Sequence, residues 1–385
     1  MVKGTSVLRE LNKRKILSLI RQQGKSSRQD LVDQMNVSKN TISLIVDELI
    51  RHNVLEESGE KEEGRRGRPK VIIQINKGTL KTIGISISKN HIDYSVINYY
   101  GEIIESKSLG NNSTDVKETI KEILKIAHIL LARYEHVIGI GIGVPGNVDS
   151  EKKYIYESTH LGWENVSLDE LNQLRSFVLV RNSVNMGATQ ALDWDSQAGK
   201  QSNLFYLRVS EGVGGAYVVN NKLIEGSSWT AGEIGHISVD AGGRICECGQ
   251  KGCLEQLVNY NALINDLASI GIAPPSIIAN SLLFEQKHFE SNNVKNLMLD
   301  YGKNFGKALI YVMHLLNPSK VILDTPYNVF DDFQNACLSF IKKNALKMPN
   351  KNTKFIFEKE RYDLSKGAAF SIIINYEQEM ESYSF

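Results

Sequence analysis

The stretch FVLVRNSVNMGATQAL, residues 177–192, joins a short apolar run to a segment of small residues. The run from Phe177 to Val180 predicts a strand, and Gly187-Ala188-Thr189 is typical of the start of a helix. In an α/β protein, a strand that gives way to a helix points its end at the ligand crevice. The tip carries Asn182 and Ser183, and neither of these side chains can act alone as a base.

Length and composition place this stretch in a globular protein of ordinary make-up. The chain has 385 residues, of which 42% are apolar and 23% charged, enough for two or three structural units. No apolar run reaches the roughly 18 residues of a membrane span. The start, MVKGTSVLRELNKRKIL, has no apolar core before its charges, which argues against export. Four cysteines do not form a disulfide scaffold, and a cytoplasmic setting fits them.

The net charge of +1 conceals an asymmetry along the chain. Residues 1–70 carry a net charge of +5, and the remaining residues carry −4. A basic N-terminal piece on an acidic body indicates that the N-terminal piece meets a polyanion.

The N-terminal piece has the pattern of a helix-turn-helix. Residues 13–22 are a leading helix, and Ser27 and Ser38 each stand before a further helical run as candidate N-caps. The second helix of such a motif enters the major groove of DNA. A plain three-helix bundle with a solvated face is the alternative. The residues that we expect to contact DNA here are Ser27, Arg28, Ser38, Lys39, Asn40, Thr41 and Ser43.

A basic loop follows the helix-turn-helix. Residues 54–73, VLEESGEKEEGRRGRPKVII, predict two paired strands around a polar loop, as in the wing of a winged helix-turn-helix. Arg65, Arg66 and Arg68 alternate with glycines and are suited to a narrow minor groove or the DNA backbone. A flexible basic linker is the alternative, and a linker that orders on DNA would satisfy both interpretations.

From residue 77 the pattern becomes strand, strand, strand, helix, followed by a buried strand at Val137–Val144. A second set of the same kind begins at residue 203 with a strand at Leu204–Val209, and a last helix is expected after Gly367. The sequence therefore predicts a DNA-binding unit over residues 1–76 and a duplicated α/β body over residues 77–385. The two lobes of the body are roughly 77–200 with the C-terminal helix, and 201–365, with a ligand cleft between them.

The strongest chemical signal is AGEIGHISVDAGGRICECGQKGCLEQ, residues 231–256. His236, Cys246, Cys248 and Cys253 make a four-ligand set of the kind that holds a structural zinc ion in a closed tetrahedron. Buried thiols beside a core histidine are the alternative. Glu233 and Glu255 bracket this segment, and two fixed carboxylates can accept hydrogen bonds from the hydroxyls of a sugar.

These segments, together with GVPGNVDSEKKYIYESTHLGW, RNSVNMGA and SEGVGGAYVVNNKLIEG, resemble the ROK family of repressors and sugar kinases. The resemblance covers nearly all of residues 80–385 and implies a two-lobed, actin-like body (a duplicated ribonuclease-H-like fold) that binds a sugar between its lobes. The winged helix-turn-helix implies the repressor branch, of the xylose-repressor kind. A repressor of this branch implies operator DNA as partner, a sugar inducer such as xylose, and a homodimer.

The resemblance also assigns roles to residues. It makes His236 and the three cysteines the zinc ligands, with His236 set between metal and sugar. The sugar-pocket residues that it implies are Gly146, Asn147, Thr159, Asn182, Glu233, His236 and Glu255.

The sequence departs from the kinases of the family where catalysis would occur. The kinases have an aspartate after the residue equivalent to Asn182, as general base, and this chain has Ser183. The first phosphate loop is replaced by Ser86-Ile87-Ser88-Lys89-Asn90, and a later glycine turn by Asp324-Thr325-Pro326. Only the glycine turn at residues 212–215 survives in part.

We therefore predict a sugar-responsive repressor without enzymatic activity. One alternative is an ATP-dependent sugar kinase with a DNA-binding head. Another is a constitutive DNA-binding regulator whose pocket no longer functions.

Overall fold

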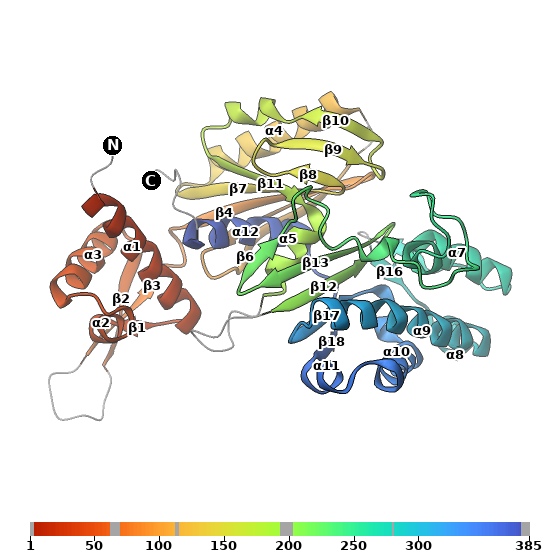
Figure 1. Ribbon diagram of the computed structural model, residues 1–385. Helices are drawn as coiled ribbons and strands as arrows, with labels where there is room; N and C mark the ends of the chain where they lie inside the picture. The colour runs from red at the N-terminus through yellow and green to blue at the C-terminus, as the bar shows by residue number, and fades with distance from the viewer. Residues whose placement is uncertain (1–3, 62–69, 112–114, 193–202, 279–280, 379–385) are drawn as a thin grey trace.

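The computed structural model describes residues 4–61, 70–111, 115–192, 203–278 and 281–378. A small N-terminal head stands beside a larger body of two lobes (Figure 1). Within the described ranges, none of the helices is both long and apolar enough to span a membrane.

The head is a winged helix-turn-helix, as predicted. The hydroxyls of Ser27 and Ser38 each accept a backbone N–H, from Asp30 and Thr41 respectively, and so cap the second and third helices. Its elements are α1 (Gly4–Gln23), β1 (Ser26–Ser27), α2 (Arg28–Met35), α3 (Lys39–Arg51), β2 (Leu55–Lys61) and β3 (Val71–Ile75). Strands β2 and β3 pair antiparallel, and β1 joins the other edge of β3. The wing arginines Arg65, Arg66 and Arg68 lie outside the described residues.

The first lobe is a five-stranded sheet in the order β11-β7-β4-β5-β6. Strands β7 and β11 run parallel to β4, and β5 and β6 form an antiparallel meander beside it. Its elements are β4 (Lys81–Ile87), β5 (His91–Asn98), β6 (Ile103–Gly110), α4 (Val116–Arg133), β7 (Val137–Val144), β11 (Phe177–Asn182), α5 (Ser183–Gln190) and the C-terminal α12 (Leu364–Gln378). A small sheet of β8 (Asn147–Asp149), β9 (Tyr154–Ser158) and β10 (Trp163–Ser167), followed by η1 (Asp169–Gln173), completes it.

The second lobe repeats this topology, with a sheet in the order β14-β13-β12-β17-β18. Each sheet thus places its first strand centrally, its second and third strands on one side and its fourth and fifth on the other. The sheet strands are β12 (Leu204–Val209), β13 (Val213–Val219), β14 (Lys222–Ile224), β17 (Lys320–Asp324) and β18 (Lys354–Phe357). The repeated order confirms the duplicated, actin-like fold.

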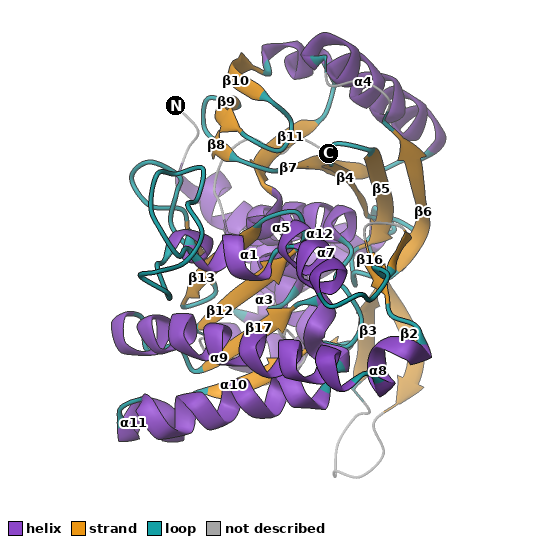
Figure 2. Cartoon of the chain, turned by 90° about the vertical axis from the view of Figure 1, so that its right-hand side faces the viewer, coloured by secondary structure: helices purple, strands orange, loops and turns teal. Residues whose placement is uncertain are grey.

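Helices fill the layers around both sheets (Figure 2). Helices α5 and α12 lie between the two sheets, α4 covers the outer face of the first, and α9 and α10 cover the outer face of the second. The remaining elements of the second lobe are η2 (Ile234–His236), α6 (Leu254–Val258), α7 (Tyr260–Ser269), β15 (Ser276–Ile278), β16 (Ser281–Leu283), α8 (Gln286–Glu290), α9 (Asn292–Leu315), η3 (Pro326–Val329), α10 (Asp331–Asn344) and α11 (Lys347–Asn352).

Two helix starts differ from the sequence prediction. Helix α5 begins at Ser183 and not near Gly187, because the Asn182 side chain accepts backbone N–H groups of the first turn. Helix α12 begins at Leu364 and not after Gly367, because Asp363 accepts the backbone N–H of Ser365 in the same way. Local side-chain capping therefore moved both starts toward the N-terminus.

Helix α12 lies close to the first sheet because the strand residue beneath it is a glycine. A Cβ on Gly84 of β4 would lie 1.9 Å from the carbonyl oxygen of Ser365 and 2.3 Å from the backbone nitrogen of Ala369. Helix α12 could not approach the strand over any larger residue, so Gly84 fixes the position of the helix that borders both the cleft and the head.

The core of the head is continuous with the core of the body. One hydrophobic cluster joins Leu17 and Ile20 of α1 to Tyr99 of the first lobe and to Ile373 and Ile374 of α12. The expected boundary between residues 76 and 77 falls in the turn between β3 and β4. Apolar packing crosses that boundary and continues into the body.

Candidate functional site

A cavity of about 450 Å³ lies between the two lobes, in the size range of small-ligand sites. It brings together all the residues predicted for the ligand pocket: Gly146, Asn147, Thr159, Asn182, Glu233, His236 and Glu255. Ser183 also lines it and is 6% exposed. The first lobe contributes the ends of β7 and β11, and the second lobe contributes the residues around the cysteine cluster.

Two asparagines of the first lobe line the cavity and differ in their hydrogen bonding. The Asn182 amide donates to the carbonyl of Gly146 at 2.7 Å, and its oxygen accepts the N–H of Val184 at 2.7 Å. Asn182 thereby ties the end of β11 to the end of β7. The side-chain oxygen of Asn147 is buried and has no hydrogen-bond partner among the described residues. An unsatisfied buried acceptor in a cavity fits a ligand that donates a hydrogen bond.

Two carboxylates stand on the second-lobe wall. Glu255 accepts the backbone N–H of Val213 at 2.9 Å, which fixes one of its oxygens. Glu233 is open to the cleft, yet desolvation by the surrounding protein raises the pKa of its carboxyl group. The nearby charge of Glu255 also raises this pKa, and His236 lowers it. The two carboxylates offer acceptor oxygens to hydroxyl groups.

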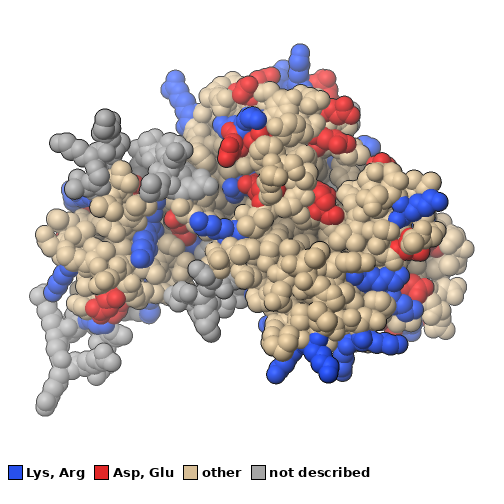
Figure 3. Space-filling model, viewed as in Figure 1, with Lys and Arg blue, Asp and Glu red and all other residues tan. Residues whose placement is uncertain are grey.

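The charge of the lining is predominantly acidic. Four glutamates line the cavity, namely Glu157, Glu233, Glu247 and Glu255. Its one arginine, Arg208, is paired with buried Asp324. Asp and Glu side chains also gather over β8, β9 and β10 at this side of the molecule (Figure 3). An acidic lining suits a neutral polyol better than an anion.

Sequence reasoning missed His160 and Trp229, which also line the cavity. A Cβ on Gly212 would lie 2.6 Å from Nε2 of His160 and 2.9 Å from Oε2 of Glu255, so both side chains lie against the Gly212 turn. His160 lies in the quoted segment STHLGW, three residues before Trp163, but nothing in the local pattern points its side chain at the second lobe.

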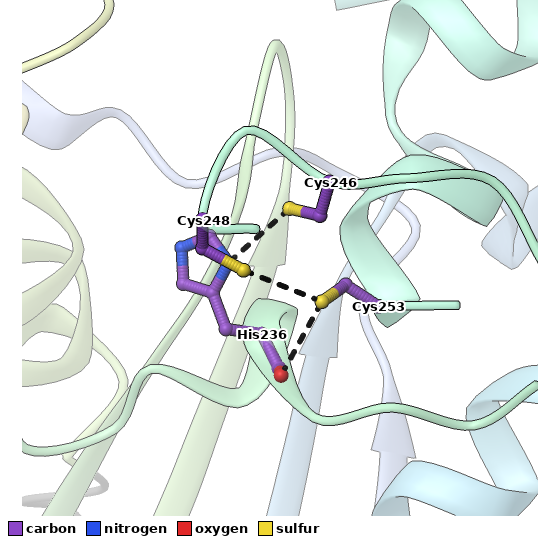
Figure 4. Close-up of side chains that lie close together, drawn as sticks. All are labelled: His236, Cys246, Cys248 and Cys253. Carbon is purple, nitrogen blue, oxygen red and sulfur yellow. Dashed lines mark hydrogen bonds between the residues drawn. The ribbon is translucent and has the colours of Figure 1, made fainter. Parts of the chain in front are cut away.

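Four side chains converge on one point (Figure 4), and two of them, His236 and Cys248, also line the cavity. The ligand atoms of His236, Cys246, Cys248 and Cys253 all lie within 4.8 Å of one another. The His236 Nδ1 and the Cys246 sulfur are 3.6 Å apart, as are the sulfurs of Cys248 and Cys253. A tetrahedral ion held by thiolates at about 2.3 Å separates its sulfurs by about 3.8 Å, so the four groups fit a metal ion.

The backbone around the cluster explains how three cysteines reach one point. Gly252 has φ 69°, and a Cβ there would lie 1.5 Å from the carbonyl oxygen of Asp240. Only glycine permits this crossing of two chain segments. The backbone N–H of Gln250 lowers the pKa of Cys248 to about 7, whereas burial raises the pKa values of Cys246 and Cys253. Cys337 is fully buried in α10, away from this cluster.

In this chain, groups of the turns that would hold the phosphates of a nucleotide form hydrogen bonds within the protein instead. The N–H and hydroxyl of Ser88 both donate to the carbonyl of His91, which closes the β4–β5 turn on itself. In the surviving glycine turn, the Val213 N–H is taken by Glu255. Asp324, at the end of β17, is fully buried between Arg208 and Arg361.

The predicted DNA-contact residues of the head fall into two groups. Ser38, Lys39 and Asn40 are exposed at the start of α3, with Thr41 and Ser43 half-buried beside them. Ser27 is 2% exposed and its hydroxyl caps α2, so its side chain does not face outward. Arg28 is half-exposed and pairs with Asp47 at 2.7 Å.

The chain is similar in sequence and in structure to known proteins. The model of the family described as "ROK family" matches residues 82–373. A "Xylose repressor" of Caldicellulosiruptor bescii is 28% identical over 345 residues, covering 85% of this chain and 86% of the relative. A "Glucokinase" of Halalkalibacterium halodurans is 28% identical over 233 residues, covering 58% and 64%. A solved "ROK family transcriptional regulator, homolog of E.coli MLC protein" superposes with a TM-score of 0.79 at 22% identity, covering 96% and 97% of the two chains.

Proposed function

This chain belongs to the ROK family, and from that premise we propose that it is a transcriptional repressor released from its operator by a sugar. A relative named as a xylose repressor aligns over 85% of the chain, whereas the aligned glucokinase covers 58% of it. Xylose is the inducer that this relative suggests. A repressor of this kind acts in the bacterial cytoplasm, where its operator is.

One observation carries the sugar part of the proposal. The seven residues expected at a sugar pocket line a single cavity whose charged groups are mainly carboxylates. Hydroxyl groups can donate to Glu233, Glu255 and the unpartnered oxygen of Asn147. A sugar phosphate would place its charge against these same carboxylates, so we propose an unphosphorylated sugar.

We propose further that the body has no kinase activity. Ser183 stands at the position of the expected general base, and no carboxylate follows Asn182. The Ser88 N–H is bonded to His91 within its own turn, and Asp324 is buried in ion pairs with Arg208 and Arg361, so neither is available to phosphates. ADP release on mixing with ATP and aldoses would revive the alternative of a sugar kinase.

The metal that we propose for the four-ligand cluster is zinc, in a structural role. Three thiolates and one imidazole close a tetrahedron without a position for water, so the ion would not be hydrolytic. When bound, it holds Glu233 and Glu255 in fixed relation through the segments that carry His236 and Cys253.

DNA binding and dimer formation complete the proposal. Ser38, Lys39 and Asn40 lie at the exposed start of the recognition helix, with Thr41, Ser43 and the wing arginines as further contacts. Two heads on two half-sites require a homodimer. Leu315, Leu346 and Met348 are 78%, 62% and 66% exposed, and the Leu346 N–H donates to His314 of α9, which makes this apolar surface a candidate dimer contact.

A mobility-shift titration tests the function directly. The full chain would be titrated on the DNA upstream of its own gene at one salt concentration, with and without millimolar xylose, glucose and other sugars. Release by one sugar supports the repressor and identifies the inducer. Binding that no sugar changes would favour the constitutive regulator, and no specific binding would contradict the proposal.

A further inference from the structure

Trp229 lies at the cavity wall in a backbone conformation that its side chain disfavours. Its φ is 58°, in the left-handed region that bulky residues with a Cβ rarely adopt. The indole is half-buried and lines the cavity between the lobes. A strained backbone conformation at a cavity wall indicates a functional reason for having tryptophan at position 229.

The neighbouring residues hold the segment around Trp229 in place. Glu225, four residues earlier, forms an ion pair with Arg181 of β11 at 3.3 Å. Its carbonyl accepts the N–H of Ala231 at 3.1 Å and closes the loop. The hydroxyls of Ser228 and Thr230, the residues before and after Trp229, are 2.9 Å apart. The loop from the second lobe is thus anchored to a strand of the first.

The indole also has an aromatic partner across the cleft. The ring of Tyr156, on β9 of the first lobe, stacks on Trp229 with 5.6 Å between centroids and 26° between planes. The ammonium of Lys152 lies 6.0 Å from the indole centroid. Neither Tyr156 nor Lys152 lines the cavity, so neither covers the part of the indole that does, and no other ring of the described residues stacks on it.

We propose that the cavity side of Trp229 is an aromatic wall against which the C–H face of a pyranose ring packs. This inference rests on the proposed sugar-binding function and adds the shape of the ligand to it. A pyranose carries its hydroxyls mainly around its rim and apolar C–H groups on its faces. Glu233 and Glu255 accept the rim hydroxyls, and the indole covers a face that water would otherwise wet.

The proposal separates ring sugars from open-chain polyols. Xylitol has the hydroxyl chemistry of xylose but no flat face, so it gains little from the indole. Backbone strain adds a second signature, because glycine adopts φ 58° without cost. Trp229→Gly is expected to raise the melting temperature above that of Trp229→Ala while both variants bind the sugar less tightly.

Calorimetric titration of the full chain with D-xylose, D-glucose and xylitol tests the wall. We expect Trp229→Ala and Trp229→Gly to raise the Kd of the ring sugar about 5- to 10-fold, and Trp229→Phe to raise it less. The chain has three tryptophans, and the sugar-induced change in tryptophan fluorescence should be lost in Trp229→Phe. Tyr311→Ala removes a 49% exposed aromatic side chain of α9 and is the matched control.

The outcomes distinguish this inference from the proposed function. If the wild-type chain binds a ring sugar and Trp229→Ala binds it equally well, the aromatic wall is wrong and the sugar site stands. If Trp229→Ala weakens ring sugar and xylitol by the same factor, the indole has no role in recognising the ring face. If no sugar binds the wild-type chain, the proposed sugar site itself fails.

Discussion

Arg21 and Glu377 form a two-point ion pair although they lie at opposite ends of the chain. The Arg21 Nε and a second guanidinium nitrogen donate to the two carboxylate oxygens at 2.7 and 2.6 Å. The side chains are 3% and 4% exposed. Ser18 and Tyr99 also donate to Glu377, so its oxygens are fully engaged. The pair fixes α1 of the head against α12 of the body.

Removing one partner of this pair should destabilise the protein. We expect Arg21→Ala to cost about 3 to 5 kcal/mol of unfolding free energy, because it leaves the Glu377 carboxylate buried without its cation. Arg21→Met combined with Glu377→Leu should recover much of the loss. Urea unfolding measures both, with Lys125→Ala, which breaks an exposed pair on α4, as the control. Equal stability of Arg21→Ala and wild type would contradict the role of the pair.

Glu255→Ala should separate sugar response from DNA binding. The variant loses a carboxylate on the cavity wall that is far from the head, so operator affinity should stay within about 2-fold. The sugar concentration for half-release should rise at least about 10-fold, since a charge-assisted hydrogen bond is lost. Glu164→Ala removes an exposed glutamate of β10 outside the cavity and is the control. Unchanged release would remove Glu255 from the pocket.

Lys39 should contribute to DNA affinity by charge. Lys39→Ala is expected to weaken binding uniformly across sequences and to reduce the slope of log affinity against log salt by about 1. Asn40→Ala should instead relax the preference for operator sequence, as loss of a base contact does. Lys121→Ala, at an exposed position of α4, should change neither the salt slope nor the sequence preference. A salt slope in Lys39→Ala equal to that of wild type would place Lys39 away from the phosphates.

Metal analysis should find about one zinc ion per chain. Cys253→Ala should lower the zinc content and the melting temperature together, since an ion bound in the folded state stabilises that state. Cys337→Ala, in the core of α10, should lower stability while it retains the zinc. Protein purified with adequate zinc that contains none, and that a chelator does not destabilise, would contradict a metal at this cluster.

Glu105 should give the unfolding free energy a pH dependence in acid. Hydrogen bonds from Tyr134, Tyr94 and Arg133 lower the pKa of Glu105 to about 2, against an ordinary 4.5. Its contribution is therefore fully present above pH 4.5 and is lost as the pH falls toward 2. Glu105→Gln should be less stable than wild type at pH 7, with a difference that shrinks below pH 4.5. A difference independent of pH would show that the carboxylate charge contributes nothing.

The sequence predicted the parts of the fold that depend on local pattern. Alternating and continuous apolar runs placed β7 and β12 at their observed bounds, and Ser27 and Ser38 marked the helix-turn-helix. The cluster of His236 and the cysteines was predictable because its ligands lie within 18 residues of one another. Each of these features has its cause within one short segment.

Contacts between distant segments were not predictable in the same way. Nothing near Arg21 shows that its partner is Glu377, and nothing near His160 shows that it lies against the Gly212 turn. The left-handed backbone of Trp229 is likewise invisible in the letters SSWTAG, because φ is set by how the loop closes. The short strand β18 (Lys354–Phe357) was missed because its register comes from pairing with β17.

The core shared by α1 and α12 has a consequence for protein engineering. A chimera that joins this head to another sugar-sensing body at residue 76 would expose Leu17 and Ile20 and separate Arg21 from Glu377. Such a graft must carry the last turns of α12, or a body whose final helix offers the same apolar surface and acid. The portable DNA-binding module of this protein is therefore discontinuous, made from both ends of the polypeptide.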